Sequence, residues 1–112
     1  MEDGLIVISI DVADGAEAAY HAWHQAHIRE VVDAVPSIVG ARRYTLGAPE
    51  SAAPPSPTSR FLALYAVAGG DVAAARAAIA AASAEGRVTP PPPGVVAGAV
   101  TLPYEAAAPI VD

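Results

Sequence analysis

The amino-acid sequence predicts a single α+β domain whose elements follow the order β-α-β-β-α-β. Four short stretches are rich in β-branched and other apolar residues and are bounded by glycine or proline, as strands are. Two longer stretches carry the start and stop signals of helices. A chain of 112 residues is long enough for one compact domain and too short for two independent cores. Residues 1–112 are therefore expected to form one domain.

The first half of the chain predicts a strand, a helix and a second strand. The first strand is expected at residues 5–12, the β-branched run LIVISIDV. Asp14 followed by Glu17 has the spacing of a capping box, which predicts a helix from this point to about Ala34. The helix is expected to stop there because the Val-Pro pair that follows disfavours the α conformation. Strand character returns at residues 38–46.

The second half of the chain predicts a strand, a helix and a final strand. The third strand is expected at residues 61–68, the run FLALYAVA. Asp71 is a typical N-cap, and Gly86 is typical of the position just beyond a helix C-terminus. The alanine-rich stretch between these two residues is therefore predicted to be helical. The fourth strand is expected at residues 95–102.

Three segments are predicted to lack helix or strand. Residues 48–59 are rich in proline and serine, a composition that suits an exposed loop. The stretch TPPPPG at residues 89–94 predicts a stiff, extended connector. Residues 103–112 are expected to form an extended C-terminal tail that a second subunit could receive.

The element order β-α-β-β-α-β is that of the ferredoxin-like, or split β-α-β, arrangement. It predicts a four-stranded antiparallel sheet with two helices on one face, which leaves the other face bare. In the first strand both faces carry apolar side chains, Ile6 and Ile8 on one and Leu5 and Val7 on the other. Much of the hydrophobic fraction of 54% is alanine, which buries little area. We therefore expect a homodimer in which the bare faces of two sheets stack on each other.

Composition and charge argue against several classes of function. Six basic against twelve acidic residues give a net charge of −6, so neither nucleic acid nor an anionic membrane is expected as a partner. The absence of cysteine excludes disulfides, thiolate catalysis and zinc-thiolate sites. The acidic start MEDG is unlike a secretory signal, and no apolar run is long enough to span a membrane. A soluble, cytoplasmic protein is expected.

Six short motifs in the chain are informative together: Trp23-His24, His27-Ile28, Glu30-Val31-Val32, Val35-Pro36-Ser37-Ile38, Ala41-Arg42-Arg43-Tyr44 and Phe61-Leu62-Ala63-Leu64-Tyr65. These motifs resemble the EthD-like members of the dimeric α/β-barrel superfamily. The resemblance covers roughly residues 5–104 and is more specific in the first half. Ser37 stands where those proteins usually have glycine, and His24 where they more often have an aromatic residue.

The resemblance implies a dimer with facing sheets and, in each subunit, a ligand pocket between the helices and the sheet. It does not select a reaction, because relatives include cofactor-free oxygenases, lactone isomerases, polyketide cyclases, dehalogenating enzymes and haem-handling enzymes. A histidine four residues after the tryptophan belongs to the family pattern. His27 occupies that position in this chain.

The three histidines of the chain lie on the first predicted helix at intervals of three residues. A helical projection places His24 and His27 on the same apolar face as Tyr20 and puts His21 at the border of that face. The simplest interpretation of each is a packed histidine whose nitrogens are hydrogen-bonded. Two imidazoles on one apolar face, however, favour a pocket that receives at least one of them. A stable metal site needs three or four ligands, and Asp11 is the best candidate for a third beside the two histidines. No recognised ligand motif is present, so no metal is expected.

Tyrosines and charged residues complete the predicted site. Tyr44 and Tyr65, on the second and third strands, could polarise a carbonyl beside an imidazole, although a strand tyrosine is by default a packing residue. Arg42 could bind an anionic substrate, although an ion pair is the commoner role. Asp11 could orient a histidine or lie in a subunit interface, and strand alternation does not decide between these. Trp23 and Tyr20 are expected to contact the substrate.

The residues together favour an enzyme that moves a proton next to a carbonyl group. His27 or His24 would be the general base, and Tyr44 or Tyr65 would donate to the developing oxyanion. The reaction would be an isomerisation, cyclisation or dehydration of a polyketide-like or aromatic carbonyl compound, with no cofactor. Two alternatives remain, namely a cofactor-free or haem-type monooxygenase, and a small-molecule binding or accessory protein without catalytic activity.

Overall fold

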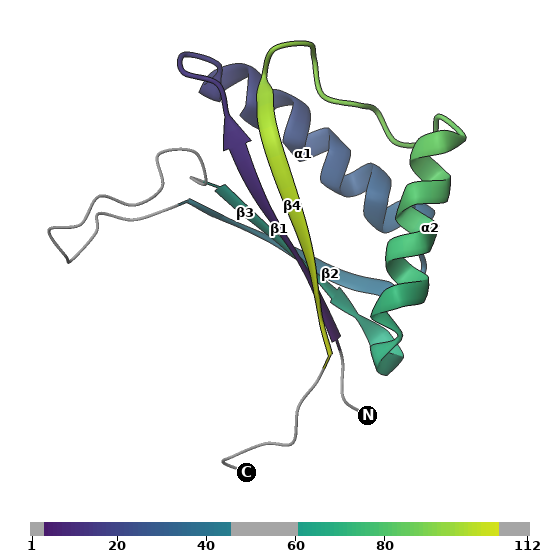
Figure 1. The fold of residues 1–112 in the computed structure, drawn as a ribbon. Coiled ribbons are helices and arrows are strands. Elements are labelled where there is room, and N and C mark those ends of the chain that lie inside the picture. Colours follow the sequence, from purple (N-terminus) through teal and green to yellow (C-terminus); the bar gives the residue numbers. More distant parts are fainter. Residues whose placement is uncertain (1–3, 46–60, 106–112) are drawn as a thin grey trace, which may run out of the picture.

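A computed structural model describes residues 4–45 and 61–105 and contains one antiparallel sheet with two helices on one of its faces (Figure 1). The predicted four-stranded ferredoxin-like architecture is confirmed, with strand order β2-β3-β1-β4. The predicted loop at residues 48–59 lies outside the described residues. The elements are β1 (Gly4–Val12), α1 (Glu17–Ala34), β2 (Ile38–Thr45), β3 (Phe61–Val67), the 3-10 turn η1 (Ala68–Gly70), α2 (Val72–Ala84) and β4 (Val96–Tyr104).

The hydrophobic core lies between the sheet and the two helices. Strand alternation places Ile6 and Ile10 of β1 on this covered face, where both side chains are buried. Tyr65 of β3 pairs directly opposite Ile6 and shares its face. From α1, Tyr20 and Val31 pack into the same layer, as the helical projection predicts. The imidazole of His24 is buried beside them, so the core between α1 and the sheet contains a polar ring.

The N-terminus of α1 differs from the prediction. The helix begins at Glu17 with Ala16 as its N-cap, and no side chain caps it, so the predicted capping box of Asp14 and Glu17 is wrong. The physical reason is Gly15, whose φ of 80° places it in the left-handed region. A residue in that conformation cannot be part of a right-handed helix, and Asp14 therefore lies in a turn before the helix.

Both ends of α2 match the prediction. The carboxylate of Asp71 accepts a hydrogen bond of 3.0 Å from the backbone N–H of Ala74 and caps the N-terminus. At the C-terminus Gly86 has a φ of 76°, and the N–H of Arg87 donates to the carbonyl of Ala82 at 2.9 Å. This geometry is a Schellman motif, and it turns the chain sharply back toward α1.

Strand β4 is longer at its C-terminal end than predicted. The strand is predicted to end at Leu102, whereas Pro103 and Tyr104 also belong to β4 and pair with Ile6 and Leu5. An edge strand tolerates proline because the missing N–H can lie on the side without a partner strand. Residues 106–112 of the predicted tail lie outside the described residues.

The sheet face opposite the helices is bare within residues 4–45 and 61–105. Six large apolar or aromatic side chains are exposed there, which leaves much of this face unfavourable in water. These residues are Leu5, Tyr44, Leu62, Val100, Leu102 and Tyr104. Neither helix of the described part of the chain is long and apolar enough to cross a membrane.

Replacement of Gly4 by alanine is expected to lower the free energy of unfolding by about 1–3 kcal/mol. A Cβ at this position would overlap Cγ2 of Val72, whose β-branched side chain has little freedom to move away, and would lie 3.1 Å from the carbonyl oxygen of Tyr104. Gly40→Ala is the matched control, because its Cβ would meet only the Cβ of Ala66 at 4.0 Å. Urea denaturation of both variants measures the difference. Equal stabilities of the two variants would contradict the close packing of β1 against α2.

Candidate active site

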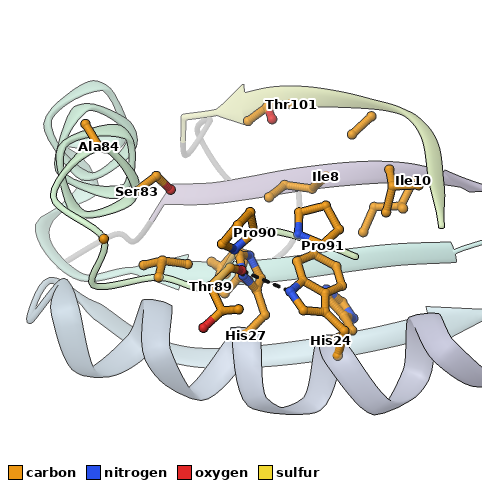
Figure 2. Close-up of a pocket in the computed structure, with 16 residues that line it drawn as sticks. Ile8, Ile10, His24, His27, Ser83, Ala84, Thr89, Pro90, Pro91 and Thr101 are labelled. Atoms are coloured by element: carbon orange, nitrogen blue, oxygen red, sulfur yellow. Dashed lines mark hydrogen bonds between the residues drawn. The ribbon is translucent and has the colours of Figure 1, made fainter. Parts of the chain in front are cut away.

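A cavity of about 660 Å³ lies between α1, the C-terminal end of α2, the loop that follows α2, and the sheet. Figure 2 shows α1 along one side of it, Ile8 and Ile10 of β1 on the other, and Ser83 and Ala84 of α2 at one edge. Most of the wall is apolar, and none of the described residues that line it carries a formal charge at neutral pH. The polar groups that reach it include the side chains of His24, His27 and Tyr65.

His24 is a buried, neutral histidine whose orientation is fixed by Tyr20. Its Nδ1 lies 3.0 Å from the Tyr20 hydroxyl one helical turn earlier, and only 1% of its surface is exposed. Burial, followed by the positive charge of Arg43 and by the neighbouring histidines, lowers the pKa of His24 to about 4. The positive charge of Arg43, which lies beside the Tyr20 ring, favours the Tyr20 hydroxyl as the donor to Nδ1 of His24. His24 then carries its proton on Nε2 and can act as a hydrogen-bond donor.

His27 has the opposite tautomer. Its Nδ1–H donates to the backbone carbonyl of Thr89 at 3.1 Å, which leaves the lone pair of Nε2 available. Burial lowers the pKa of His27, while the Thr89 carbonyl and the charge of Glu30 partly offset this effect. A neutral imidazole with a free lone pair at pH 7 can accept a proton, which is the requirement for a general base.

Trp23 holds the loop after α2 against the helix that carries both histidines. Its Nε1–H donates to the same Thr89 carbonyl at 2.9 Å, and its ring lies 4.4 Å from that of His27 between centroids. The ring centroids of Trp23 and His24 are 5.6 Å apart. The indole therefore packs against both imidazoles and forms one wall of the cavity.

Tyr65 contributes a buried hydroxyl to the same cavity. The residue is 1% exposed, and its hydroxyl oxygen has no hydrogen-bond partner among residues 4–45 and 61–105. Burial, together with the nearby Tyr20, raises the pKa of Tyr65, so the phenol stays protonated. A buried polar group without a partner costs about 1–3 kcal/mol, and a ligand oxygen would remove that cost. His24 and Tyr65 thus offer two donors to the cavity, and His27 offers an acceptor.

The structure separates the predicted site residues into two groups. His24, His27, Tyr65 and Trp23 line the cavity, and Tyr20 lies directly behind His24. The remaining predicted residues, Tyr44, Arg42 and Asp11, lie on the sheet face away from the helices, as their pairing with Leu62, Leu64 and Gly98 shows. For Asp11 the sequence leaves open on which face of the sheet the side chain lies, and the structure places it on the face away from the histidines. Within one chain these three residues do not reach the two histidines.

Three residues near the histidines are absent from the sequence prediction. Arg43, not Arg42, extends to the helix side, where it hydrogen-bonds His21 and lies 5.8 Å from the centre of the Tyr20 ring. Strand alternation could have identified it, because adjacent strand residues face opposite sides. Thr89 and Glu30 are connected to His27, but no local pattern in the sequence indicates this contact.

Within the part of the chain that the structure describes, no three histidine, aspartate or glutamate side chains gather closely enough to hold a metal ion. The two cavity histidines each use Nδ1 in a hydrogen bond to another residue. Asp11, the third ligand considered from the sequence, lies on the other face of the sheet.

The low pKa of His24 predicts a loss of stability in mild acid. The unfolded chain binds this proton with a pKa near 6.5 and the folded chain only near 4, so folding is increasingly opposed as the pH falls through this window. Between pH 7 and pH 5 His24 alone is expected to cost on the order of 2 kcal/mol. Urea denaturation of the wild type and of His24→Gln at both values measures the effect. An equal pH dependence in the two proteins would show that His24 is not held neutral.

The fold and the cavity place the chain among ferredoxin-like α+β proteins. No family model matches the sequence, and no curated protein matches it. A crystal structure of a dimeric ferredoxin-like protein of unknown function from Thermobifida fusca has a TM-score of 0.51 and 15% identity, over 94% of this chain and 92% of that chain. The crystal structure of HapK from Hahella chejuensis has a TM-score of 0.51 and 17% identity, over 97% of this chain and 99% of that chain. At these identities the likeness defines the fold.

Proposed function

We propose that this protein is a cofactor-independent enzyme that transfers a proton next to the carbonyl group of a small, apolar compound. The observation that carries the proposal is the unpartnered, buried Tyr65 hydroxyl in the same cavity as His27. A substrate carbonyl oxygen that accepts from Tyr65 would supply the hydrogen-bond partner that the hydroxyl lacks. The same oxygen becomes the oxyanion when a neighbouring C–H loses its proton. His27 takes that proton on Nε2, and the Nε2–H of His24 is a second donor.

The nature of the cavity wall supports a neutral substrate. No Arg, Lys, Asp or Glu lies among the described residues that line the cavity, so a carboxylate or phosphate would enter without a counter-ion. The apolar wall and the indole of Trp23 suit an aromatic or polyketide-like ring system. Isomerisation, cyclisation and dehydration all begin with this proton transfer, so the site supports this group of reactions.

The EthD-like resemblance and the dimer belong to the same proposal. A second copy of the chain would cover the bare sheet face that exposes Leu62, Val100 and Leu102, and one structural neighbour is itself described as dimeric. Two such sheets would form a dimeric α/β barrel, with Tyr44, Arg42 and Asp11 near the subunit interface. The molar mass in solution, measured by light scattering, distinguishes one copy from two.

Hydrogen–deuterium exchange at carbon tests the proposed chemistry without knowledge of the product. Cyclic and aromatic ketones that carry α-hydrogens are incubated with the protein in D₂O, and loss of the α-proton signal is followed by NMR. At least one compound that binds is expected to exchange faster than in buffer. Compounds that bind in the cavity and exchange only at the buffer rate would contradict the proposal, and they would indicate a binding protein.

A further inference from the structure

The loop between α2 and β4 is attached to α1 from two sides at Thr89. On one side the carboxylate of Glu30 accepts the backbone N–H of Thr89 at 3.1 Å and its hydroxyl at 2.9 Å. On the other side the carbonyl of Thr89 accepts Nε1–H of Trp23 at 2.9 Å and Nδ1–H of His27 at 3.1 Å. One side chain of α1, Glu30, therefore holds Thr89 by its two donors, and two side chains, Trp23 and His27, hold it by its carbonyl.

The local sequence explains why the Thr89 carbonyl lies within hydrogen-bond distance of Nδ1 of His27. Glu30 and His27 are three residues apart on α1 and so lie on neighbouring turns of one face. The proline at position 90 restricts Thr89 to extended conformations and gives the Thr89–Pro90 peptide no N–H of its own. Thr89 itself is exposed, so water competes for its carbonyl. The two hydrogen bonds from Glu30 keep the residue in place against that competition.

We propose that Glu30 is a positioning residue for His27, acting through Thr89 to fix the imidazole proton on Nδ1 and to leave the Nε2 lone pair available in the cavity. The inference rests on the proposed function, in which His27 is the base. Glu30 does not line the cavity and does not contact the reacting atoms. Its carboxylate stabilises the one loop conformation that presents a carbonyl to Nδ1.

The surrounding charges agree with this role. The hydrogen bonds from Thr89 lower the pKa of Glu30, which keeps the carboxylate ionised at neutral pH. Both the Thr89 carbonyl and the charge of Glu30 raise the pKa of His27 against the effect of burial. His24 is the other titratable group of α1 beside His27, with ring centroids 6.1 Å apart, and across the cavity Tyr65 is protonated. The described cavity wall adds no formal charge.

The tautomer of His27 in the ligand-free protein tests the proposal directly. In ¹⁵N-labelled full-length protein, imidazole ¹⁵N shifts are expected to show Nδ1 protonated and Nε2 unprotonated. Glu30→Ala is expected to give a mixture of both tautomers and a lower pKa of His27, because both influences that raise it are weakened. Thr89→Val is expected to lose tautomer preference in part, and Thr89→Ser to retain it, since serine keeps the hydroxyl. Asp33→Ala, which removes an exposed carboxylate one turn further along α1, is the matched control.

The proposal is overturned if His27 has the same tautomer and pKa in Glu30→Ala as in Asp33→Ala. A role in loop packing alone would give that result. In the exchange assay, the rate should fall across these variants in proportion to the fraction of His27 with the proton on Nδ1. Because the tautomer is measured without ligand, a wild-type protein that shows the Glu30 effect but exchanges no bound compound would reject the proposed function alone.

Discussion

Replacement of His27 by alanine is expected to slow deuterium incorporation into a bound ketone by about 10²–10⁴-fold, the usual contribution of a positioned general base. The reason is the loss of the only histidine in the described cavity whose Nδ1–H donates to a backbone carbonyl and leaves Nε2 free. The loop after α2 should stay in place, because Trp23 still donates to Thr89 and Glu30 still accepts from it. The measurement is the exchange rate at saturating compound.

His21→Ala is the matched control for this experiment. His21 lies on the same helix, but its Nδ1 contacts Arg43 and its side chain does not line the cavity. Its removal should leave the exchange rate nearly unchanged. In the wild type the rate should fall as the pH falls through the pKa of His27, which burial places below its ordinary value. A rate that His27→Ala leaves intact would remove His27 from the mechanism.

Tyr65→Phe is expected to reduce the exchange rate by about 10²–10³-fold while leaving the ligand-free protein as stable as before or more so. The two effects differ because the Tyr65 hydroxyl has no hydrogen-bond partner in the described part of the fold. It therefore contributes to the reaction and does not stabilise the folded protein. Tyr20→Phe provides the contrast, since it removes a hydrogen bond to His24 and should cost about 0.5–1.5 kcal/mol.

Urea denaturation and the exchange assay on this pair separate a functional phenol from a structural one. A loss of stability in Tyr65→Phe as large as that in Tyr20→Phe would mean that the Tyr65 hydroxyl has a structural partner. An unchanged exchange rate in Tyr65→Phe would remove it from oxyanion stabilisation.

The sequence predicts the element order and the buried face of α1 because both depend on local signals. Helical periodicity places Tyr20 and His24 on one face, and both side chains are buried. Asp71 and Gly86 mark the ends of α2 because capping is a property of a few adjacent residues. Gly15 shows the limit of such signals, since its left-handed conformation displaced the start of α1.

The composition of the cavity is harder to predict because it depends on long-range packing. Tyr44 and Tyr65 look alike in the sequence, and only the register of β2 and β3 places one on the bare face and the other under the helices. Thr89 and Glu30 are 59 residues apart, so their contact has no local pattern. The histidines that line the cavity can therefore be predicted from the helical pattern. The contact of the loop at Thr89 and the position of the Tyr65 hydroxyl depend on the whole fold.

The most direct test of the account is the infrared stretch of a ¹³C-labelled carbonyl in the ketone that exchanges fastest, bound to the wild type and to Tyr65→Phe. The central claim is that the Tyr65 hydroxyl donates to that carbonyl while His27 faces the adjacent carbon. The predicted result is a stretch at lower frequency in the wild-type complex than in the Tyr65→Phe complex, because a hydrogen bond weakens the C=O bond. The same frequency in both complexes would contradict the claim.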